Sequence, residues 1–180
     1  MPKKKSLFVH LGTVGYQGKA MELRAGSYRS ASPLSELIPQ AKRNLNIEHH
    51  SVDIQPHKGE LPLNVKHFIS DFRSQLEQYA NNSVSGIRSK LALGFHGYEF
   101  EDAKEYTLST FKVAHKKLVS GGKMVFTIDS LMDSEIKKQL IESGFEREKI
   151  KIKRLPPNKR KAHLSNKTYP GIIYEVTAIK

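Results

Sequence analysis

The fold of this chain is decided by one stretch of its second half, Val113-Ala-His-Lys-Lys-Leu-Val-Ser-Gly-Gly-Lys-Met-Val-Phe126. Apolar side chains at helical spacing fill residues 103–118, and the pair Gly121-Gly122 then interrupts the chain. The next six residues, 123–128, form a dense apolar run that is typical of a buried strand. A helix, a glycine break and a buried strand in direct succession indicate an α/β unit.

The same alternation of strands and helices extends toward the N-terminus. We expect strands at residues 6–11, 27–32, 47–54 and 90–95, and helices at residues 17–25, 33–45 and 63–79. In the helix at 33–45, Ser32 is the expected N-cap and Pro33 lies in the first turn. Its expected buried stripe is Leu34, Leu37, Ile38, Ala41 and Leu45. Residues 81–86 are predicted to be a polar connection.

Toward the C-terminus we expect a helix at 133–143 ended by Gly144, a strand at 150–155 and a last strand at 171–179. The segment 155–170 contains three prolines and no apolar periodicity, so the last two strands are joined by a loop and should be antiparallel. Residues 172–179 are predicted to pair between the strands at 123–128 and 150–155. The pattern predicts one doubly wound domain over residues 1–180. Its sheet has seven mostly parallel strands and an antiparallel last strand, with a basic leader at 1–5 and a basic loop at 156–170.

Composition excludes several classes of protein. The 180 residues contain no cysteine, which removes disulfides, thiolate metal sites and cysteine nucleophiles. Apolar runs are far shorter than the roughly 20 residues of a bilayer span, and no signal-peptide pattern follows the first lysines. We therefore expect a soluble, cytoplasmic protein without a membrane partner. Adjacent histidines such as His49-His50 point to opposite faces of a strand, and we predict no metal site.

The order of elements resembles the class I (Rossmann-like) fold of the S-adenosylmethionine-dependent methyltransferases. The stretch Phe8-Val-His-Leu-Gly-Thr-Val-Gly15 resembles the first motif of that family, and the stretch quoted above resembles its fourth helix, double glycine and fifth strand. The resemblance implies S-adenosylmethionine as cofactor. The residues that it implies at the cofactor are His10, Gly12, Thr13, Gly15, Ser30, Asp53 and Gly94.

Two family positions differ in this chain. The family usually has a carboxylate near the end of its first strand, where this chain has His10, and another at the end of its second strand, where the alignment reaches Ser30. Asp53 aligns with the end of the third strand, where the family places an acid or amide at the adenine. A lone acid at a strand end is equally consistent with a cap or turn residue.

Candidate chemistry follows the fourth expected strand. Of the polar residues there, His96 is the candidate general base, because an unperturbed imidazole titrates near ~6.5. Tyr98 is placed with it at the substrate, and Glu99 is a candidate for orienting the substrate. A packing role for the histidine is the alternative.

The balance of charge favours a polyanionic partner. Thirty Lys and Arg against 18 Asp and Glu give a net charge of +12. Lys159, Arg160 and Lys161 lie in the basic loop and are candidates for contacting phosphates, with a solvated loop as the alternative.

We therefore predict a methyltransferase that acts on RNA or another nucleic acid. One alternative is a non-catalytic Rossmann-like binding module that has lost the cofactor site, because His10 and Ser30 replace the expected acids. A nucleotide-binding oxidoreductase is a further alternative, which the spacing of Gly12, Gly15 and Gly18 disfavours.

Overall fold

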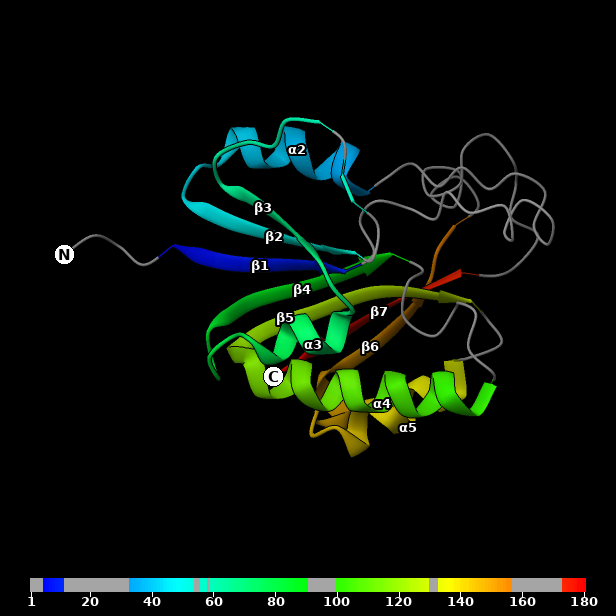
Figure 1. Cartoon of the computed structure of the whole chain (residues 1–180). Helices are drawn as coiled ribbons and strands as arrows, with labels where there is room; N and C mark the ends of the chain where they lie inside the picture. The colour runs from blue at the N-terminus through cyan, green and yellow to red at the C-terminus, as the bar shows by residue number, and fades with distance from the viewer. Residues whose placement is uncertain are drawn as a thin grey trace.

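The computed structural model describes residues 5–11, 33–53, 56–57, 59–90, 100–129, 133–156 and 173–180. Within these residues the chain forms a seven-stranded sheet of order β3-β2-β1-β4-β5-β7-β6 (Figure 1). The strands are β1 (Ser6–Leu11), β2 (Ile47–Asp53), β3 (Val65–Ile69), β4 (Val84–Lys90), β5 (Leu118–Asp129), β6 (Ile150–Arg154) and β7 (Ile173–Ile179). The helices are α2 (Pro33–Arg43), α3 (Phe72–Glu77), α4 (Phe100–Lys117) and α5 (Asp133–Glu142), with a 3-10 turn, η2 (Arg147–Lys149).

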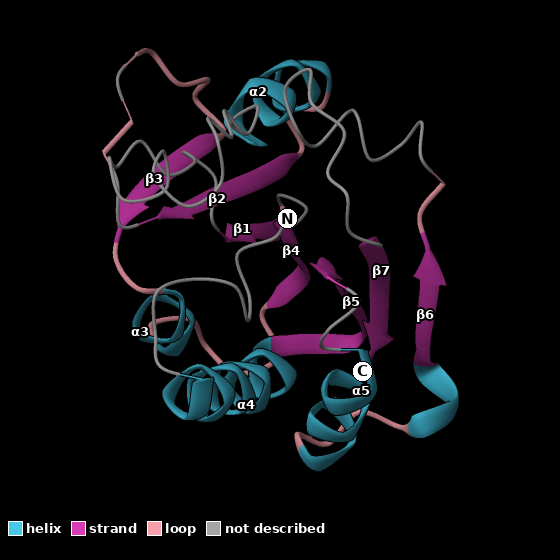
Figure 2. Cartoon of the chain, turned by 90° about the vertical axis from the view of Figure 1, so that its right-hand side faces the viewer, coloured by secondary structure: helices cyan, strands magenta, loops and turns pink. Residues whose placement is uncertain are grey.

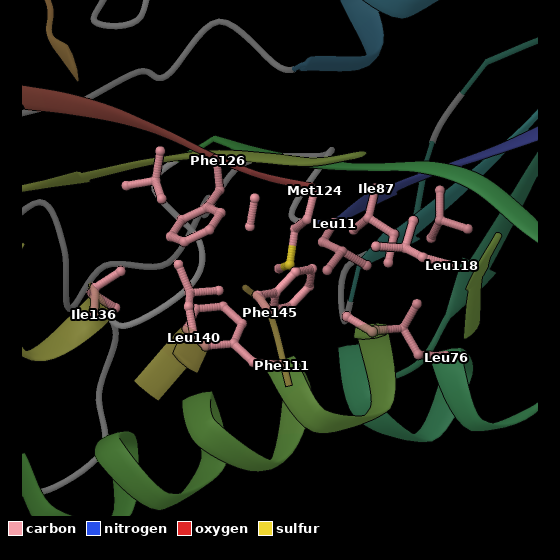
Figure 3. Packing of buried hydrophobic residues seen from close by; sticks show 14 of the residues in the cluster. Leu11, Leu76, Ile87, Phe111, Leu118, Met124, Phe126, Ile136, Leu140 and Phe145 are labelled. Carbon is pink, nitrogen blue, oxygen red and sulfur yellow. The ribbon is translucent and has the colours of Figure 1, made fainter. Parts of the chain in front are cut away.

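The sheet has helices on both faces, as a doubly wound fold requires. Figures 1 and 2 show α2 on one face and α3, α4 and α5 on the other. We call these the α2 face and the α4 face. The main core fills the α4 face, where Phe111 of α4 packs beside Phe126 of β5, and Leu140 of α5 and Phe145 join them (Figure 3). A smaller cluster of Leu34, Leu37, Ala41 and Val65 lies under α2.

Strand pairing confirms the predicted direction of the last strand. β1 pairs in parallel with β2 on one side and with β4 on the other. β7 lies antiparallel between β5 and β6, with Val125 opposite Thr177 and Thr177 opposite Lys151. The chain therefore reverses its direction between β6 and β7, as the sequence indicated.

Several predicted elements have the expected positions. β1 has the predicted bounds, and β2, α4, α5 and β6 differ from prediction by a few residues at most. Gly144 ends α5 with a φ of 102°. Its backbone N–H donates to the carbonyl of Ile141, and that of Phe145 donates to Leu140, which is the αL ending that glycine permits.

The predicted helix at 63–79 is wrong, because the segment forms β3 and then α3. Apolar residues spaced three and four apart satisfy a helix, but the strand pairs with β2 and uses only alternate positions. The break falls at Asp71, the N-cap of α3, whose carboxylate accepts the backbone N–H of Ser74 at 3.0 Å. The sequence showed this cap only as one acid inside an apolar pattern.

The fourth strand and one helix face also differ from prediction. β4 begins at Val84, inside the predicted polar connection, and ends at Lys90, where the strand was expected to start. The turn residue is Asn82, with a φ of 54°. Leu45, assigned to the buried stripe of α2, is 61% exposed because α2 ends at Arg43. The strand predicted at 27–32 and the helix predicted at 17–25 lie outside the described residues.

Gly86 allows β1 and β4 to pair closely. The ring of Phe8 lies over it, so that a Cβ at residue 86 would stand 2.6 Å from Cε1 of Phe8. We predict that Gly86→Ala lowers the free energy of unfolding by about 1–3 kcal/mol through overpacking. In a Phe8→Ala background the cost should be smaller, and a double-mutant cycle of urea unfolding measures this coupling. An equal cost in both backgrounds would contradict the explanation.

Candidate functional site

The carboxyl ends of β1, β2 and β4 form the edge at which a ligand site is expected. The chain runs from β1 outward to β2 and β3, and then returns to β4 on the other side of β1. The direction of winding therefore reverses between β1 and β4. In open α/β sheets ligands bind outside the carboxyl ends of the strands at such a reversal. The described residues that end these strands are Leu11, Asp53 and Lys90.

Asp53 occupies a different strand position from the one predicted. It is the last residue of β2, and β2 lies directly beside β1. Asp53 is thus at the end of the second strand, the position that the resemblance had assigned to Ser30, and not at the end of the third. Of the two carboxylates that the family has and the alignment lacked, the one at the end of the second strand is therefore present in this chain as Asp53. The side chain is 7% exposed, and its backbone carbonyl accepts the N–H of Ser70 at 3.0 Å.

His10 lies one residue before the end of β1 and is buried on the α2 face. Its Nε2 is 3.1 Å from Nδ1 of His49. Burial, helped by the nearby charge of His49 and of Arg88, lowers the pKa of His10 to about 3. The imidazole is therefore neutral at neutral pH. It can exchange hydrogen bonds with a ligand, but it supplies no negative charge in place of the family's carboxylate.

Other histidines lie next to His10 on the same face. Ser51 of β2 is in register with His10 on one side and with His67 of β3 on the other. Ser51 Oγ and His67 Nδ1 are 2.9 Å apart. A pocket of about 130 Å³ adjoins this row and is lined by Phe8, His10, Gln40, Ile47, His49 and Arg88. Sequence reasoning missed this pocket, although residues alternating along β1 and β2 place its lining on one face.

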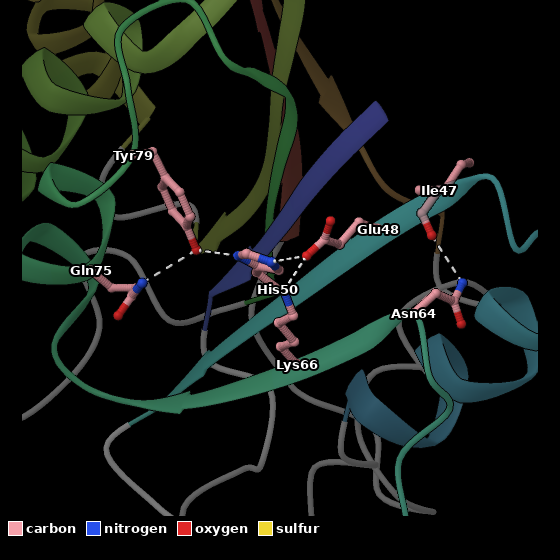
Figure 4. A network of polar contacts seen from close by, with 7 residues as sticks. All are labelled: Ile47, Glu48, His50, Asn64, Lys66, Gln75 and Tyr79. Carbon is pink, nitrogen blue, oxygen red and sulfur yellow. Dashed lines mark hydrogen bonds and ion pairs between the residues drawn. The ribbon is translucent and has the colours of Figure 1, made fainter. Parts of the chain in front are cut away.

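His49 and His50 point to opposite faces, as predicted. His50 belongs to a second polar group on the α4 face, which joins β2, β3 and α3 (Figure 4). Its Nδ1 is 2.8 Å from the hydroxyl of Tyr79, and its Nε2 is 2.8 Å from Oε1 of Glu48. Lys66 binds the same carboxylate oxygen at 2.7 Å. No cluster of three acidic, histidine or cysteine side chains suited to a metal occurs in the described part of the chain.

The charges in this group suit a structural role. Hydrogen bonds from Lys66 and then from His50 lower the pKa of Glu48 to about 2. Burial raises the pKa of Tyr79 to about 12, so its hydroxyl stays neutral. The ammonium group of Lys117 donates to the carbonyls of Glu77 and Tyr79 at 3.1 and 2.6 Å. These bonds hold the C-terminal end of α3 to the end of α4, where β5 begins.

The other predicted site residues lie outside the described part of the chain. Those predicted for the cofactor are Gly12, Thr13, Gly15, Ser30 and Gly94. Those predicted for catalysis are His96 and Tyr98, and those predicted for the substrate are Glu99, Lys159, Arg160 and Lys161. His10 and Asp53 are the two predicted site residues that the structure brings into view, and they lie on adjacent strands at one edge.

Several solved structures have a similar fold. A methyltransferase dependent on S-adenosylmethionine from Archaeoglobus fulgidus matches with a TM-score of 0.61 at 14% identity, over 99% of this chain and 87% of that one. Phosphoethanolamine N-methyltransferase 2 of Haemonchus contortus matches with a TM-score of 0.59 at 12% identity, over 99% of this chain. The chain spans about half (49%) of the length of that enzyme.

A third match is the 16S rRNA (adenine(1408)-N(1))-methyltransferase of Catenulisporales acidiphilia. It has a TM-score of 0.58 and 11% identity, over 97% of this chain and 87% of that one. The chain has the class I methyltransferase fold. The predicted fold class is therefore confirmed. No protein-family model matches the sequence, and no curated protein matches it by sequence. In the described residues, no helix is long and apolar enough to cross a membrane.

Burial of a neutral His10 makes stability depend on pH. The unfolded chain protonates this imidazole below ~6.5, whereas the folded chain does so near 3, so the contribution is full above pH ~6.5 and is lost as pH falls. We predict that His10→Gln reduces the slope of unfolding free energy between pH 6 and 4. The expected reduction is up to about 1.4 kcal/mol per pH unit. Urea unfolding across this range measures it, and an unchanged slope would show that His10 is protonated in the folded state.

Proposed function

We propose that this protein is an S-adenosylmethionine-dependent methyltransferase that acts on RNA. The observation that carries the proposal is the position of Asp53, a carboxylate at the end of the strand beside β1, where the winding of the sheet reverses. A carboxylate at the second strand end is the group that this fold uses to bind a ribose through two hydroxyls. The three compared structures are methyltransferases by name, one of a small phosphorylated amine and one of ribosomal RNA.

The residues at this edge fit the cofactor in chemical terms. Asp53 supplies a charge-assisted acceptor for the ribose hydroxyls, and the glycines at 12 and 15 follow β1 directly, where a chain without Cβ atoms lets a ligand approach the backbone. Neutral His10 can accept one hydrogen bond or donate one at the same place. When bound, S-adenosylmethionine supplies an electrophilic methyl group.

The role of the protein in such a transfer is to position the acceptor atom in line with that methyl group and to remove a proton where the acceptor carries one. We assign the proton transfer to His96 and the orientation of the acceptor to Tyr98 and Glu99, since all three follow β4 in the sequence. This places them after a strand that ends at the same edge as Asp53.

RNA is proposed as the substrate because of charge. The chain has a net charge of +12, and a cationic protein gains affinity for a phosphate backbone by releasing counterions. Lys159, Arg160 and Lys161 of the basic loop are the residues assigned to phosphates in this proposal.

A non-catalytic binding module is the second candidate, and His10 is the observation that favours it. A buried neutral imidazole replaces an expected carboxylate, so the site has one negative charge fewer than the family provides. Binding of S-adenosylmethionine separates the two candidates, because a module that has lost the cofactor site would not retain it.

We predict that the protein binds S-adenosylmethionine in calorimetry, and that Asp53→Asn weakens binding by about 10–100-fold. This range corresponds to the loss of charge-assisted hydrogen bonds worth about 1.5–3 kcal/mol. Glu146→Gln is the control, since it removes the same charge before β6, at the opposite edge of the sheet, from an exposed residue bound to Lys149. Thermal melts check that both variants fold.

Two results would contradict this assignment. Absence of binding by the parent protein at millimolar ligand would remove the enzyme and favour the binding module. Equal affinities of the parent protein and Asp53→Asn would show that Asp53 does not hold the ribose.

A further inference from the structure

Part of the α2 face is lined by exposed cations. These exposed cations are Arg88 of β4, Lys123 of β5, and Lys151 and Lys153 of β6, and we call the four side chains the basic strip. Among the described helices α2 is the one on this face, and it packs on β2 at the other end of the sheet (Figure 2). The helices on the opposite face bury the alternate residues of the same strands, such as Met124 and Val176.

Strand register places the basic strip in one plane. Arg88 is the partner of Val125, Val125 of Thr177, and Thr177 of Lys151, so these residues form one row across four strands. Lys123 and Lys153 lie on the same face, each two residues along its strand from this row. Three strand spacings separate the two ends of the row, which is about 14 Å. That length is enough to lie against several successive phosphates of an extended strand.

Charge selects the partner for this surface. Among the residues of β4 to β7 whose exposure the structure describes, the carboxylate on this face is Glu175, which is half-buried and in register with Lys153. A second copy of the chain would bring like charges together, which costs free energy. A phosphodiester backbone has the complementary charge and also gains from counterion release.

An aromatic ring lies at the inner end of the basic strip. Phe8 is partly buried, lies over Gly86 beside Arg88, and lines the pocket together with Arg88 and His10. Aromatic rings on sheet surfaces stack on unpaired bases, whereas the bases of a duplex stack on one another and are not available. The ring therefore favours a single strand over a duplex.

We propose that the basic strip is a docking surface for single-stranded RNA, with the phosphates on the four cations and a base against Phe8. The choice of RNA rests on the proposed function, whereas the surface itself rests on the register and exposure of the strip. The basic strip contains none of the residues Lys159, Arg160 and Lys161 that the proposed function assigns to phosphates, so it adds further contacts to the substrate.

The test is a titration of a labelled 15-nucleotide oligouridylate at several salt concentrations. The variant Lys123→Gln, Lys151→Gln, Lys153→Gln should bind at least about tenfold more weakly at 0.1 M salt, and the magnitude of its salt slope should fall by up to about 2, which is ~0.7 for each lost phosphate contact. The control Lys116→Gln, Lys137→Gln, Lys138→Gln removes three exposed lysines from α4 and α5 on the opposite face. It changes the net charge equally and should retain the affinity and slope of the parent protein.

Several outcomes would overturn the proposal. Equal losses in both triple variants would mean that net charge alone drives binding, and no loss in either would mean that RNA lies elsewhere. Duplex RNA or anionic phosphatidylserine vesicles bound more tightly than the oligouridylate, or a dimer in light scattering that the strip variant abolishes, would assign the surface to another partner.

The same variants separate this proposal from the proposed function. Calorimetry with S-adenosylmethionine should give the same affinity for the strip variant as for the parent protein, because its three substituted lysines lie on β5 and β6, on the other side of β1 and β4 from Asp53 on β2. RNA binding through the strip in a protein that binds no S-adenosylmethionine would retain the docking surface and remove the methyltransferase.

Discussion

The parallel pairing of β1 with both β2 and β4 is the constraint on which the rest of this structure depends. The strand is hydrogen-bonded on both edges, and Val9 and Leu11 are buried against the α4 face. Because the chain winds outward from β1 to β2 on one side and has β4 on the other, the carboxyl ends of these three strands meet at the point where the winding reverses. The position of Asp53 follows from this topology rather than from any local property of its sequence.

Alternation along the central strands gives the two faces different chemistry. In β1 and β2, Val9, Leu11 and Val52 enter the main core, whereas His10, His49 and Ser51 point to the α2 face. Glu48 and His50 are polar residues of β2 on the α4 face, and bonds to Glu48 and Tyr79 satisfy both ring nitrogens of His50. Buried polar groups are tolerated when their partners are fixed in this way. The polar surface that a ligand can reach is therefore concentrated on the α2 face and at the carboxyl edge.

Sequence reasoning succeeded where a single element has an unambiguous signal. Gly144 marks the end of α5, and the prolines before Gly171 mark the reversed last strand. The double glycine at 121 and 122 does not separate α4 from β5 as predicted, because β5 begins at Leu118, directly after α4, and runs through both glycines. Sequence reasoning also failed at residues 63–79, because Val65, Phe68 and Phe72 fit a helix while pairing with β2 and the cap at Asp71 divide the segment. Periodicity cannot report a strand partner 16 residues away in the chain, such as His67 for Ser51.

The failure at residues 63–79 also explains the error in the candidate site. With residues 63–79 assigned to a helix, a sheet of seven strands required a strand at residues 27–32. That extra strand moved Asp53 from the end of the second strand to the end of the third. Once β3 is recognised, β2 lies beside β1, and the acid expected at the second strand end is present. The remaining difference from the family is His10, whose neutrality follows from its burial between His49 and the cation of Arg88. A carboxylate at residue 10 would neutralise the charge of the neighbouring Arg88, whereas a neutral imidazole does not. The positive surface of β5 and β6 therefore continues through Arg88 up to the candidate site.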